Sequence, residues 1–318
     1  MCCPTLRELP APAKHKTGWP WTGESERLPD KMPDGRPWPK ISIVTPSYNQ
    51  GQFIEETIRS VLLQGYPNLE YIIIDGGGTD NSVEVIKKYS PWLTYWVSEP
   101  DRGQSHAINK GFTKAQGAIF GWLNSDDLLL PSATRHVVDA WQKNPSAVAW
   151  VGGCHRIDPD WRILSTVIPK GLDRDSMADW GRQGWFFQPS CFSAVKAWRK
   201  VGSLDENLHF AFDLDLWLRL ATVGDFIIIP KIISAATIHS GAKTQAQVTH
   251  MHAEIAIIQI RHGYQEIAMR RLVHWFERPS LNDEIRSALK AKFRRLARRF
   301  VFWKKRQQVR YLQGLINS

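Results

Sequence analysis

A short apolar run that ends on two adjacent acids constrains this chain more than any other feature of its sequence. Residues 119–123 read Ile-Phe-Gly-Trp-Leu, which is typical of a buried strand, and Asp126 and Asp127 follow after an Asn-Ser pair. Neighbouring carboxylates repel each other and are costly to remove from water, so packing alone does not favour them there. At the carboxyl end of a parallel strand they would face the crevice in which open α/β sheets bind ligands.

Two interpretations of Asp126 and Asp127 follow from this segment alone. Their hard oxygens suit Mg²⁺ or Mn²⁺, which carboxylates often hold together with substrate phosphates. The plain alternative is an exposed acidic pair that caps a helix beginning near Pro131. The rest of the chain has to decide between a functional site and a helix cap.

The residues around this run alternate between strand and helix patterns. Strands are expected at 41–44, 69–74, 93–97 and 119–123, and helices at 54–62, 83–86 and 107–115. Short connections between alternating strands and helices are typical of βαβ units with right-handed crossovers. The sequence therefore predicts an α/β fold with a mostly parallel central sheet flanked by helices.

The alternation weakens after about residue 150. Expected there are a strand at 148–152, a hairpin arm at 161–167, helices at 193–201, 213–222 and 244–275, and a strand at 226–229 closed by Pro230. We divide the chain into an extended N-terminal arm (1–39), the two halves of one α/β domain (40–130 and 131–243), and a helical extension (244–318). This division rests on composition and on the motifs below.

The net charge of +10 is concentrated at the end of the chain. No acid follows Glu284, whereas 11 lysines and arginines lie between Arg286 and Arg310, so the rest of the chain is nearly neutral. Apolar residues recur there every three or four positions from Ile285 to Trp303, which predicts a basic amphipathic helix. Such a helix could lie on an anionic membrane surface. It could also bind nucleic acid, which we do not expect without a recognised binding module, or dock on the protein itself.

The remaining composition places the protein in the cytoplasm. The four cysteines have neither metal-binding spacing nor the pattern of a disulfide framework, as expected for a reducing compartment. We find no secretory signal at the N-terminus and no apolar stretch long enough to span a bilayer. A cytoplasmic protein, peripheral on the inner face of the plasma membrane through its basic helix, is the expectation.

Polar clusters follow three of the predicted strands, at residues 45–51, 75–82 and 99–105. Strand ends of one parallel sheet lie side by side, so these loops should converge on one cleft with the two acids. The glycines at 76–78 would let a ligand approach the backbone closely, although a plain strand-to-helix turn would also use them. A dinucleotide site would need a glycine-rich loop after the first strand, where this chain has Pro46-Ser47-Tyr48 instead.

Taken in order, the motifs resemble those of the family 2 inverting glycosyltransferases with the GT-A fold, of the bacterial surface-polysaccharide type. They are Val-Thr-Pro-Ser-Tyr-Asn (44–49), Asp-Gly-Gly-Gly-Thr-Asp (75–80), Gly103-Gln104, Asn-Lys-Gly (109–111), Leu-Asn-Ser-Asp-Asp (123–127), Gln188-Pro189, Phe-Asp-Leu-Asp-Leu-Trp-Leu-Arg (212–219) and His239. The resemblance covers about residues 40–240, and it implies a nucleotide-sugar-binding half (40–130) and an acceptor-binding and catalytic half (131–243). Gly78 stands where the family often has Ser, and Asn124 where many members have Asp, which leaves the motif to Asp126 and Asp127.

The resemblance implies a donor site and a metal site. Nucleotide-binding roles fall to Thr45, Pro46, Tyr48, Asp75, Arg102 and Gln104, with Asp126 near the ribose. Asp127 and His239 would hold Mn²⁺ or Mg²⁺ at the donor diphosphate, where a metal neutralises the charge that grows on the leaving group. A lone histidine is more often structural, but His239 lies just past an apolar run and before Ser240-Gly241, which favours function.

Inverting transfer also needs a carboxylate that takes the proton of the acceptor hydroxyl. By the family pattern we prefer Asp213, with Asp215 as second choice, and Arg219 could orient Asp215 by an i,i+4 pair. Acids in the first turn of a helix also need no catalytic role, because they favour the helix dipole. Trp185, Gln188 and Trp217 are the candidates for acceptor contacts, since aromatic faces suit sugar rings; any one of them could instead be core.

The sequence thus predicts a metal-dependent inverting glycosyltransferase. It would move a sugar of the hexosyl type from a nucleotide-sugar, a UDP-sugar being favoured, to a saccharide or lipid-linked saccharide in surface-polysaccharide synthesis. The alternatives are a nucleotidyltransferase, which would want a basic phosphate loop that residues 47–52 lack, and a catalytically dead protein that binds nucleic acid or membrane.

Overall fold

A computed structural model describes residues 4–239, 241 and 248–276 of the chain. Its strands are β1 (Ile41–Ser47), β2 (Leu69–Asp75), β3 (Tyr95–Ser98), β4 (Ile119–Trp122), β5 (Asp127–Leu129), β6 (Ala149–Ile157), β7 (Ile163–Val167), β8 (Cys191–Ala194) and β9 (Phe226–Thr237). Its α-helices are α1 (Ile54–Leu62), α2 (Ser82–Tyr89), α3 (Gln104–Lys114), α4 (Ala133–Lys143), α5 (Arg174–Ala178), α6 (Val195–Val201), α7 (Phe212–Leu220), α9 (Val248–Arg261) and α10 (Gln265–Phe276). A first compact unit extends to Glu254 and a second begins at Ile255.

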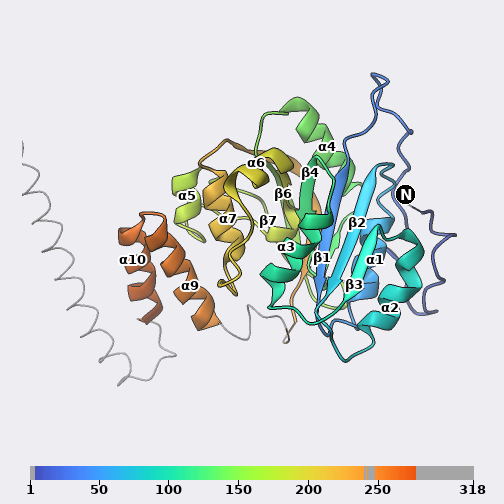
Figure 1. Cartoon of the computed structure of the whole chain (residues 1–318), viewed down its shortest axis with the longest axis horizontal. Helices are drawn as coiled ribbons and strands as arrows, with labels where there is room; N and C mark the ends of the chain where they lie inside the picture. Colours follow the sequence, from blue (N-terminus) through green and yellow to red (C-terminus); the bar gives the residue numbers. More distant parts are fainter. Residues whose placement is uncertain (1–3, 240, 242–247, 277–318) are drawn as a thin grey trace, which may run out of the picture. The chain divides into compact units, whose positions relative to one another are not determined.

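The strands form one sheet in the order β3-β2-β1-β4-β8-β6-β9-β5, with β7 paired to β6 (Figure 1). The four strands from β3 to β4 run parallel, as the alternating pattern predicts. Beyond β4 the sheet is mixed, because β8 runs antiparallel to both β4 and β6 while β9 runs parallel to β6. The parallel part brings the carboxyl ends of β1, β2 and β4 to one edge, where the candidate motifs lie.

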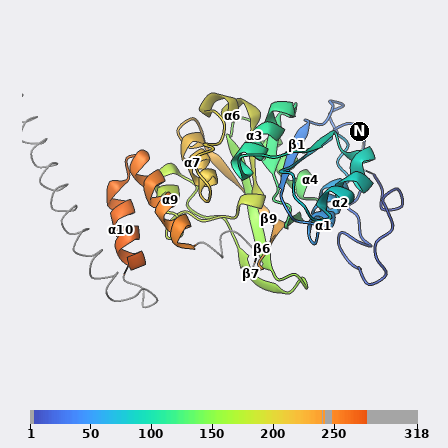
Figure 2. The same cartoon turned by 60° about the horizontal axis from the view of Figure 1, so that its bottom comes forward.

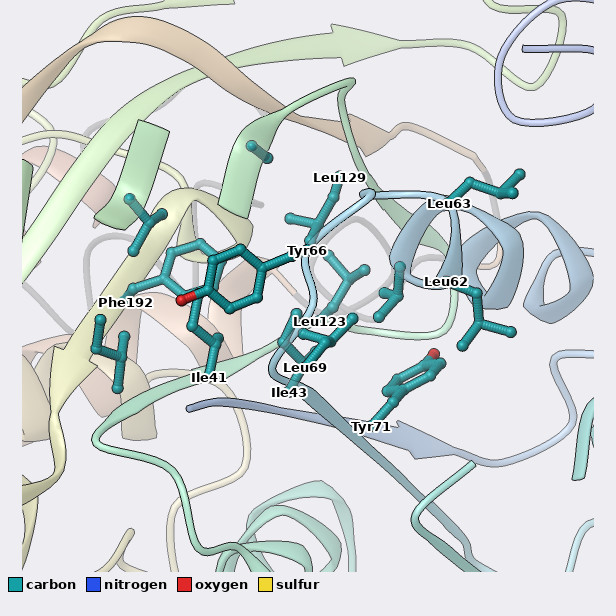
Figure 3. Close-up of a cluster of buried hydrophobic side chains, with 14 of the residues drawn as sticks. Ile41, Ile43, Leu62, Leu63, Tyr66, Leu69, Tyr71, Leu123, Leu129 and Phe192 are labelled. Carbon is teal, nitrogen blue, oxygen red and sulfur yellow. The ribbon is translucent and has the colours of Figure 1, made fainter. Parts of the chain in front are cut away.

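Alternate side chains of β1 pack on opposite faces of the sheet. Ile41 and Ile43 are buried in the core on the α1 side, together with Leu62 and Tyr71 (Figure 3). On the other face α3 approaches so closely that a Cβ added at Gly111 would lie 2.4 Å from a methyl carbon of Val44. Figure 2 shows α3 on one side of β1 and α1 with α2 on the other. Burial on both faces explains the near-continuous apolar run of this strand.

Several elements differ from the sequence-based prediction. β9 continues through Pro230 to Thr237 because its pairing with β6 slips between Val151 and Gly153, and such a bulge tolerates a residue without an N–H. The predicted helix over 244–275 is, where described, two helices that end and begin around Gly263, whose φ is +90°. The short strands β5 and β8 carry too few residues to show a period and were missed. The basic segment after Leu281 lies outside the described residues.

The N-terminal arm, where described, has little regular structure but is firmly packed. Leu9, Trp21 and Trp38 are among its buried side chains. The guanidinium of Arg59 on α1 is fully buried and donates to the backbone carbonyls of Pro10, Pro20 and Trp21, at 2.9–3.2 Å. A buried cation needs such acceptors, so the arm completes the environment of α1. Among the helices described, none combines the length and apolarity required to cross a bilayer.

Candidate active site

The glycine loop after β2 is fixed by the Asp75 carboxylate. Asp75 is fully buried, and its oxygens accept hydrogen bonds from the Ser47 hydroxyl at 2.9 Å, the Ser98 hydroxyl at 2.7 Å and the Gly77 N–H at 3.1 Å. Gly77 has a φ of +77°, a conformation that favours glycine. A Cβ at Gly78 would lie 2.6 Å from the Asn49 side-chain oxygen, so this position has no room for a larger residue without a shift. Asp75 thus holds the loops after β1, β2 and β3 together.

The candidates on and after β1 differ in accessibility. Thr45 is fully buried and its hydroxyl is 3.0 Å from the Tyr71 hydroxyl, so the structure does not support its predicted contact with a nucleotide. Pro46 is buried as well, whereas Tyr48 is 61% exposed. The adjacent Asn49 has a φ of +52°, and its side-chain oxygen accepts from the Thr79 N–H at 2.8 Å. Tyr48 is therefore the residue of this group that is free to contact a ligand.

Two further donor-site candidates lie at the start of α3. Gln104 donates to the side-chain oxygen of Asn124 at 2.7 Å, and Asn124 in turn donates to Asp127 Oδ2 at 3.1 Å. An aspartate at position 124 could not donate to Asp127 and would repel it, which gives a physical reason for the asparagine. Arg102 is largely exposed and pairs with Glu206, a residue that precedes α7. The Arg102–Glu206 pair links the loop after β3 to the segment before α7.

Asp126 and His239 face each other across the strand ends. His239 Nε2 lies 3.0 Å from Asp126 Oδ2, and the two side chains are only 10% and 20% exposed. The His239 ring packs on Phe53, which directly precedes α1, at a centroid distance of 4.5 Å. A small hollow beside Asp126 is lined by residues that include Glu56 and Trp161. The donors that could hold a divalent cation at this edge are therefore a carboxylate and an imidazole.

Asp127 is engaged with its own chain instead. Its carboxylate accepts from the Thr237 N–H at 3.3 Å and from Asn124, and β5 pairs residue 127 with Ala236 of β9. Burial, together with the neighbouring Asp126 charge, raises the pKa of Asp127 well above its ordinary value. Of the two acids, Asp126 is the one whose carboxylate contacts His239. Within the residues described, no group of three or more acidic, histidine or cysteine side chains forms a complete metal site.

Asp213 has the properties of a proton acceptor. It lies in the first turn of α7, where its Oδ1 accepts from the Leu214 N–H at 2.7 Å. Within the described part of the chain, no ion pair involves Asp213. Burial, with a smaller contribution from the Glu254 charge, raises the pKa of Asp213 to about 7. A carboxyl group that titrates near neutral pH is suited to general base catalysis.

Asp215, the second candidate, is engaged in an ion pair. Arg219 Nε lies 2.9 Å from Asp215 Oδ2, the i,i+4 contact that the sequence suggests. The same guanidinium donates to the carbonyls of Val201, Gly202 and Ser203 at 2.8–3.0 Å. Asp215 is 3% exposed and anchors α7 through Arg219 to the end of α6. Of the two acids, Asp213 is the better placed to accept a proton from a substrate.

The acceptor candidates divide between core and partly exposed residues. Trp217 is 1% exposed and packs against Phe186 and Trp180, at centroid distances of 4.3 and 5.1 Å, so it belongs to the core and the structure does not support an acceptor contact. Gln188 donates to the Trp122 carbonyl at 2.8 Å, which ties it to β4. Trp185 is partly exposed and remains a candidate. Alternation of acids and large apolar residues on α7 predicted burial, but it could not say which of those residues is buried.

Sequence reasoning missed three residues of this region: Phe53, Glu206 and Glu254. Phe53 supports His239, Glu206 pairs with Arg102, and Glu254 on α9 contacts the segment before α7. Each acts across at least 43 residues of sequence or through a ring contact, and neither kind of contact leaves a local pattern. No signal in a single sequence would have found them.

Known proteins resemble this chain in sequence and in fold. The sequence profile of the family described as "Glycosyl transferase family 2" matches residues 42–197. An uncharacterised glycosyltransferase of Mycobacterium tuberculosis (strain ATCC 25618 / H37Rv) is 32% identical over 194 residues, which are 60% of this chain and 72% of that protein. The chain belongs to glycosyltransferase family 2. The family predicted from the motifs is confirmed, and it is a family of glycosyltransferases and not of nucleotidyltransferases.

Other relatives of this family 2 glycosyltransferase cover different shares of their own length. An uncharacterised glycosyltransferase of Rickettsia typhi is 25% identical over 219 residues, 67% of this chain and 68% of that protein. Chondroitin synthase of Pasteurella multocida is 27% identical over 206 residues, 63% of this chain but only 21% of that protein. The aligned region is therefore one part of a much longer relative in the second case.

Solved structures show the GT-A fold. S. aureus TarS 1-349 in complex with UDP-GlcNAc has a TM-score of 0.54 at 16% identity, over 80% of this chain and 71% of that chain. The mannosyltransferase PcManGT from Pyrobaculum calidifontis, in complex with GDP-Man and Mn²⁺, has a TM-score of 0.53 at 18% identity, over 81% of this chain and 80% of that chain. The predicted α/β fold class is confirmed.

Proposed function

We propose that this family 2 glycosyltransferase transfers a sugar from a nucleotide-sugar to a hydroxyl group, with inversion, and that Asp213 takes the proton of the attacking hydroxyl. The observation that carries the proposal is the Asp213 carboxyl, which is half-buried, forms no ion pair among the described residues and has a pKa raised to about 7. An acid of this kind is neutral or charged at physiological pH with little cost in free energy, as a general base requires. Asp215 is the weaker candidate because Arg219 neutralises it.

A divalent cation fits the donor groups at Asp126 and His239. The sequence assigned the metal to Asp127 and His239, but the His239 imidazole contacts Asp126, and Asp127 is engaged by Thr237 and Asn124. We therefore assign Asp126 and His239 as the metal-holding residues and Asp127 as their support. A bound cation would neutralise charge on the leaving diphosphate. A mixed carboxylate and imidazole site suits Mn²⁺ better than Mg²⁺, which prefers oxygen ligands.

The donor base would lie against the exposed Tyr48 and the glycine loop that Asp75 holds. A UDP-sugar remains our preferred donor, and the complexes of fold neighbours with UDP-GlcNAc and with GDP-Man support a nucleotide-sugar of either kind. Gln104 and Arg102 flank the same edge. Trp185 is the proposed acceptor contact, because its partly exposed ring could pack on a sugar.

We further propose a saccharide or lipid-linked saccharide as the acceptor, a role in surface-polysaccharide synthesis, and a cytoplasmic location at the membrane. The relative named chondroitin synthase is in keeping with a saccharide product. The membrane proposal rests on the basic, amphipathic composition of residues 281–318, which lie outside the described residues. Deleting residues 281–318 should abolish binding to anionic vesicles, whereas any binding to neutral vesicles should not change. Unchanged binding to anionic vesicles would contradict this role.

Calorimetric titration with UDP and GDP, with and without Mn²⁺, tests the donor and metal proposals. We expect one nucleotide to bind more tightly in the presence of Mn²⁺ than in its absence. Asp126→Asn or His239→Ala should remove most of that gain, which lowers the affinity measured with Mn²⁺ roughly tenfold or more. The matched control is Glu84→Gln, which removes an exposed carboxylate of α2 that makes no hydrogen bond or ion pair with the described residues. Equal affinities with and without Mn²⁺ in the wild type would contradict metal dependence. No binding of either nucleotide would contradict the proposed donor class.

A further inference from the structure

Glu254 on α9 holds the segment that precedes the helix of the proposed base. Its Oε1 accepts from the His209 N–H at 2.8 Å, and its Oε2 accepts from the N–H groups of Phe210 and Ala211, at 2.7 and 3.1 Å. All of these residues belong to the first compact unit. One carboxylate therefore binds three consecutive backbone donors that lie more than 40 residues before it in the sequence.

These contacts hold the segment that leads into α7, and they reach the helix itself at its N-cap. Ala211 is the N-cap residue of α7 and makes no side-chain cap hydrogen bond, and Glu254 binds its N–H, one of the backbone donors that a helix start leaves without an intrahelical partner. Hydrogen bonds to an ionised carboxylate are shorter and stronger than neutral ones. The Ala211 carbonyl accepts from the Asp215 N–H at 3.2 Å, so the backbone is fixed on both sides of Asp213.

We propose that Glu254 is a positioning residue for transfer, which fixes residues 209–211 and thereby the place of the Asp213 carboxyl. The inference rests on the proposed function of Asp213. Loss of this contact would leave α7 intact, because Asp215 and Arg219 anchor it further along. Loss of the contact would, however, loosen the first turn of α7, which carries Asp213. Small displacements of a reacting group can lower the rate of a reaction by large factors.

Glu254 also acts on Asp213 through its charge. Among the described residues, the titratable groups of neighbouring elements that interact electrostatically with Asp213 are the Glu254 carboxylate of α9 and the Cys191 thiol of β8. A nearby negative charge disfavours ionisation, so Glu254 adds to the burial that raises the pKa of Asp213. Burial raises the pKa of Cys191 as well, and its thiol is neutral near pH 7. Removing the Glu254 charge should therefore lower the pKa of Asp213.

Three variants separate position from charge. Glu254→Gln keeps the length of the side chain, loses its charge and one of its two acceptor oxygens, and so cannot bind all three N–H groups. Glu254→Asp keeps the charge but is too short by one methylene. Glu84→Gln is the control for loss of a carboxylate elsewhere on the surface. The measurements are kcat, the KM for the nucleotide-sugar and the pH dependence of kcat/KM. The pKa of the Asp213 carboxyl, followed by NMR with ¹³C-labelled aspartate, is measured as well.

For Glu254→Gln we expect kcat to fall roughly ten- to a hundredfold, the KM for the donor to stay within about twofold, and the acid limb of the pH profile to move to lower pH. Glu254→Asp should lower kcat with little movement of that limb. Wild-type kcat in Glu254→Gln, or a loss of kcat with an unmoved pKa of Asp213, would overturn the proposal. If the wild type transfers no sugar, the proposed function fails, and the NMR titration still decides whether Glu254 acts on Asp213.

Discussion

At the scale of single residues, the two acids of α7 show how environment divides one sequence pattern into two roles. Asp213 and Asp215 lie two positions apart, Asp215 fully buried and Asp213 partly so. Arg219 compensates Asp215, whereas Asp213 forms no ion pair among the described residues, accepts from the Leu214 N–H and has a pKa raised to about 7. A carboxyl group whose pKa is raised in this way lowers the stability of the fold once it is ionised, a cost that is common where activity requires a destabilised group.

This cost predicts that Asp213→Asn stabilises the protein at alkaline pH. The pKa of Asp213 is about 7 in the folded state against an ordinary 3.8, so the folded protein holds a proton that the unfolded chain has lost between these values. Wild-type stability from this group is complete below pH 4 and falls as the pH rises through 7. We expect Asp213→Asn to raise the unfolding free energy by about 1–3 kcal/mol at pH 8, and by less at pH 4.

Denaturant unfolding at the two pH values measures this difference directly. Glu84→Gln is the control, since an exposed carboxylate should leave both values unchanged. If Asp213→Asn were less stable than the wild type at pH 8, or changed the unfolding free energy equally at both pH values, burial would not be the cause of the raised pKa of Asp213.

At the scale of elements, α7 depends on one ion pair for its place beside α6. Arg219 joins Asp215 to the carbonyls that end α6, so removing the carboxylate leaves a guanidinium with its strongest acceptor missing. We expect Asp215→Asn to lower the unfolding free energy by about 1–3 kcal/mol at pH 7, less than for a fully buried pair because Arg219 keeps 22% of its side-chain surface exposed.

Asp213→Asn is the matched comparison for Asp215→Asn, because it makes the same chemical change two residues earlier with the opposite expected sign at alkaline pH. Thermal or chemical unfolding of both variants at pH 8 provides the test. If the two substitutions changed stability alike, the assignment of Asp215 to structure and Asp213 to catalysis would lose its support.

At the scale of the whole molecule, the N-terminal arm is part of the fold of the first compact unit. The Arg59 guanidinium has its carbonyl partners in this arm, and the Trp21 indole N–H donates to Glu56 of α1 at 2.8 Å. A chain that begins at Gly23 should therefore unfold at a lower temperature by several degrees, because it exposes Arg59 and loses the burial of Trp21.

A double comparison isolates the contribution of Arg59. In an Arg59→Met background, the same truncation should cost less stability, because no cation is left without acceptors. Equal costs of truncation in the two backgrounds would show that burial of the arm, and not the Arg59 contacts, carries its stabilising effect.

The sequence predicts the parallel part of this fold well and the antiparallel part poorly. β1 and β4 are long enough, and buried on both faces, to show as apolar runs, and Asp126, Asp213 and His239 stand at motif positions. β5, β8 and the extension of β9 past Pro230 depend on pairing partners far away in the chain. The same holds within the site, where His239 contacts Asp126 and not Asp127. A sequence shows which residue types are present, but only folding selects their partners.

The central claim is that Asp213 takes the proton in the transfer step, and Asp213→Asn tests it most directly. Transfer and nucleotide binding would be measured for both proteins between pH 5 and 9, because the pKa of Asp213 is about 7. We expect wild-type kcat/KM to rise with pH and to level off above about 7. We expect the variant to lose roughly 10²–10⁴-fold in kcat while its nucleotide affinity stays within about twofold. Substantial turnover by Asp213→Asn, or a wild-type rate that does not fall below pH 7, would contradict the central claim.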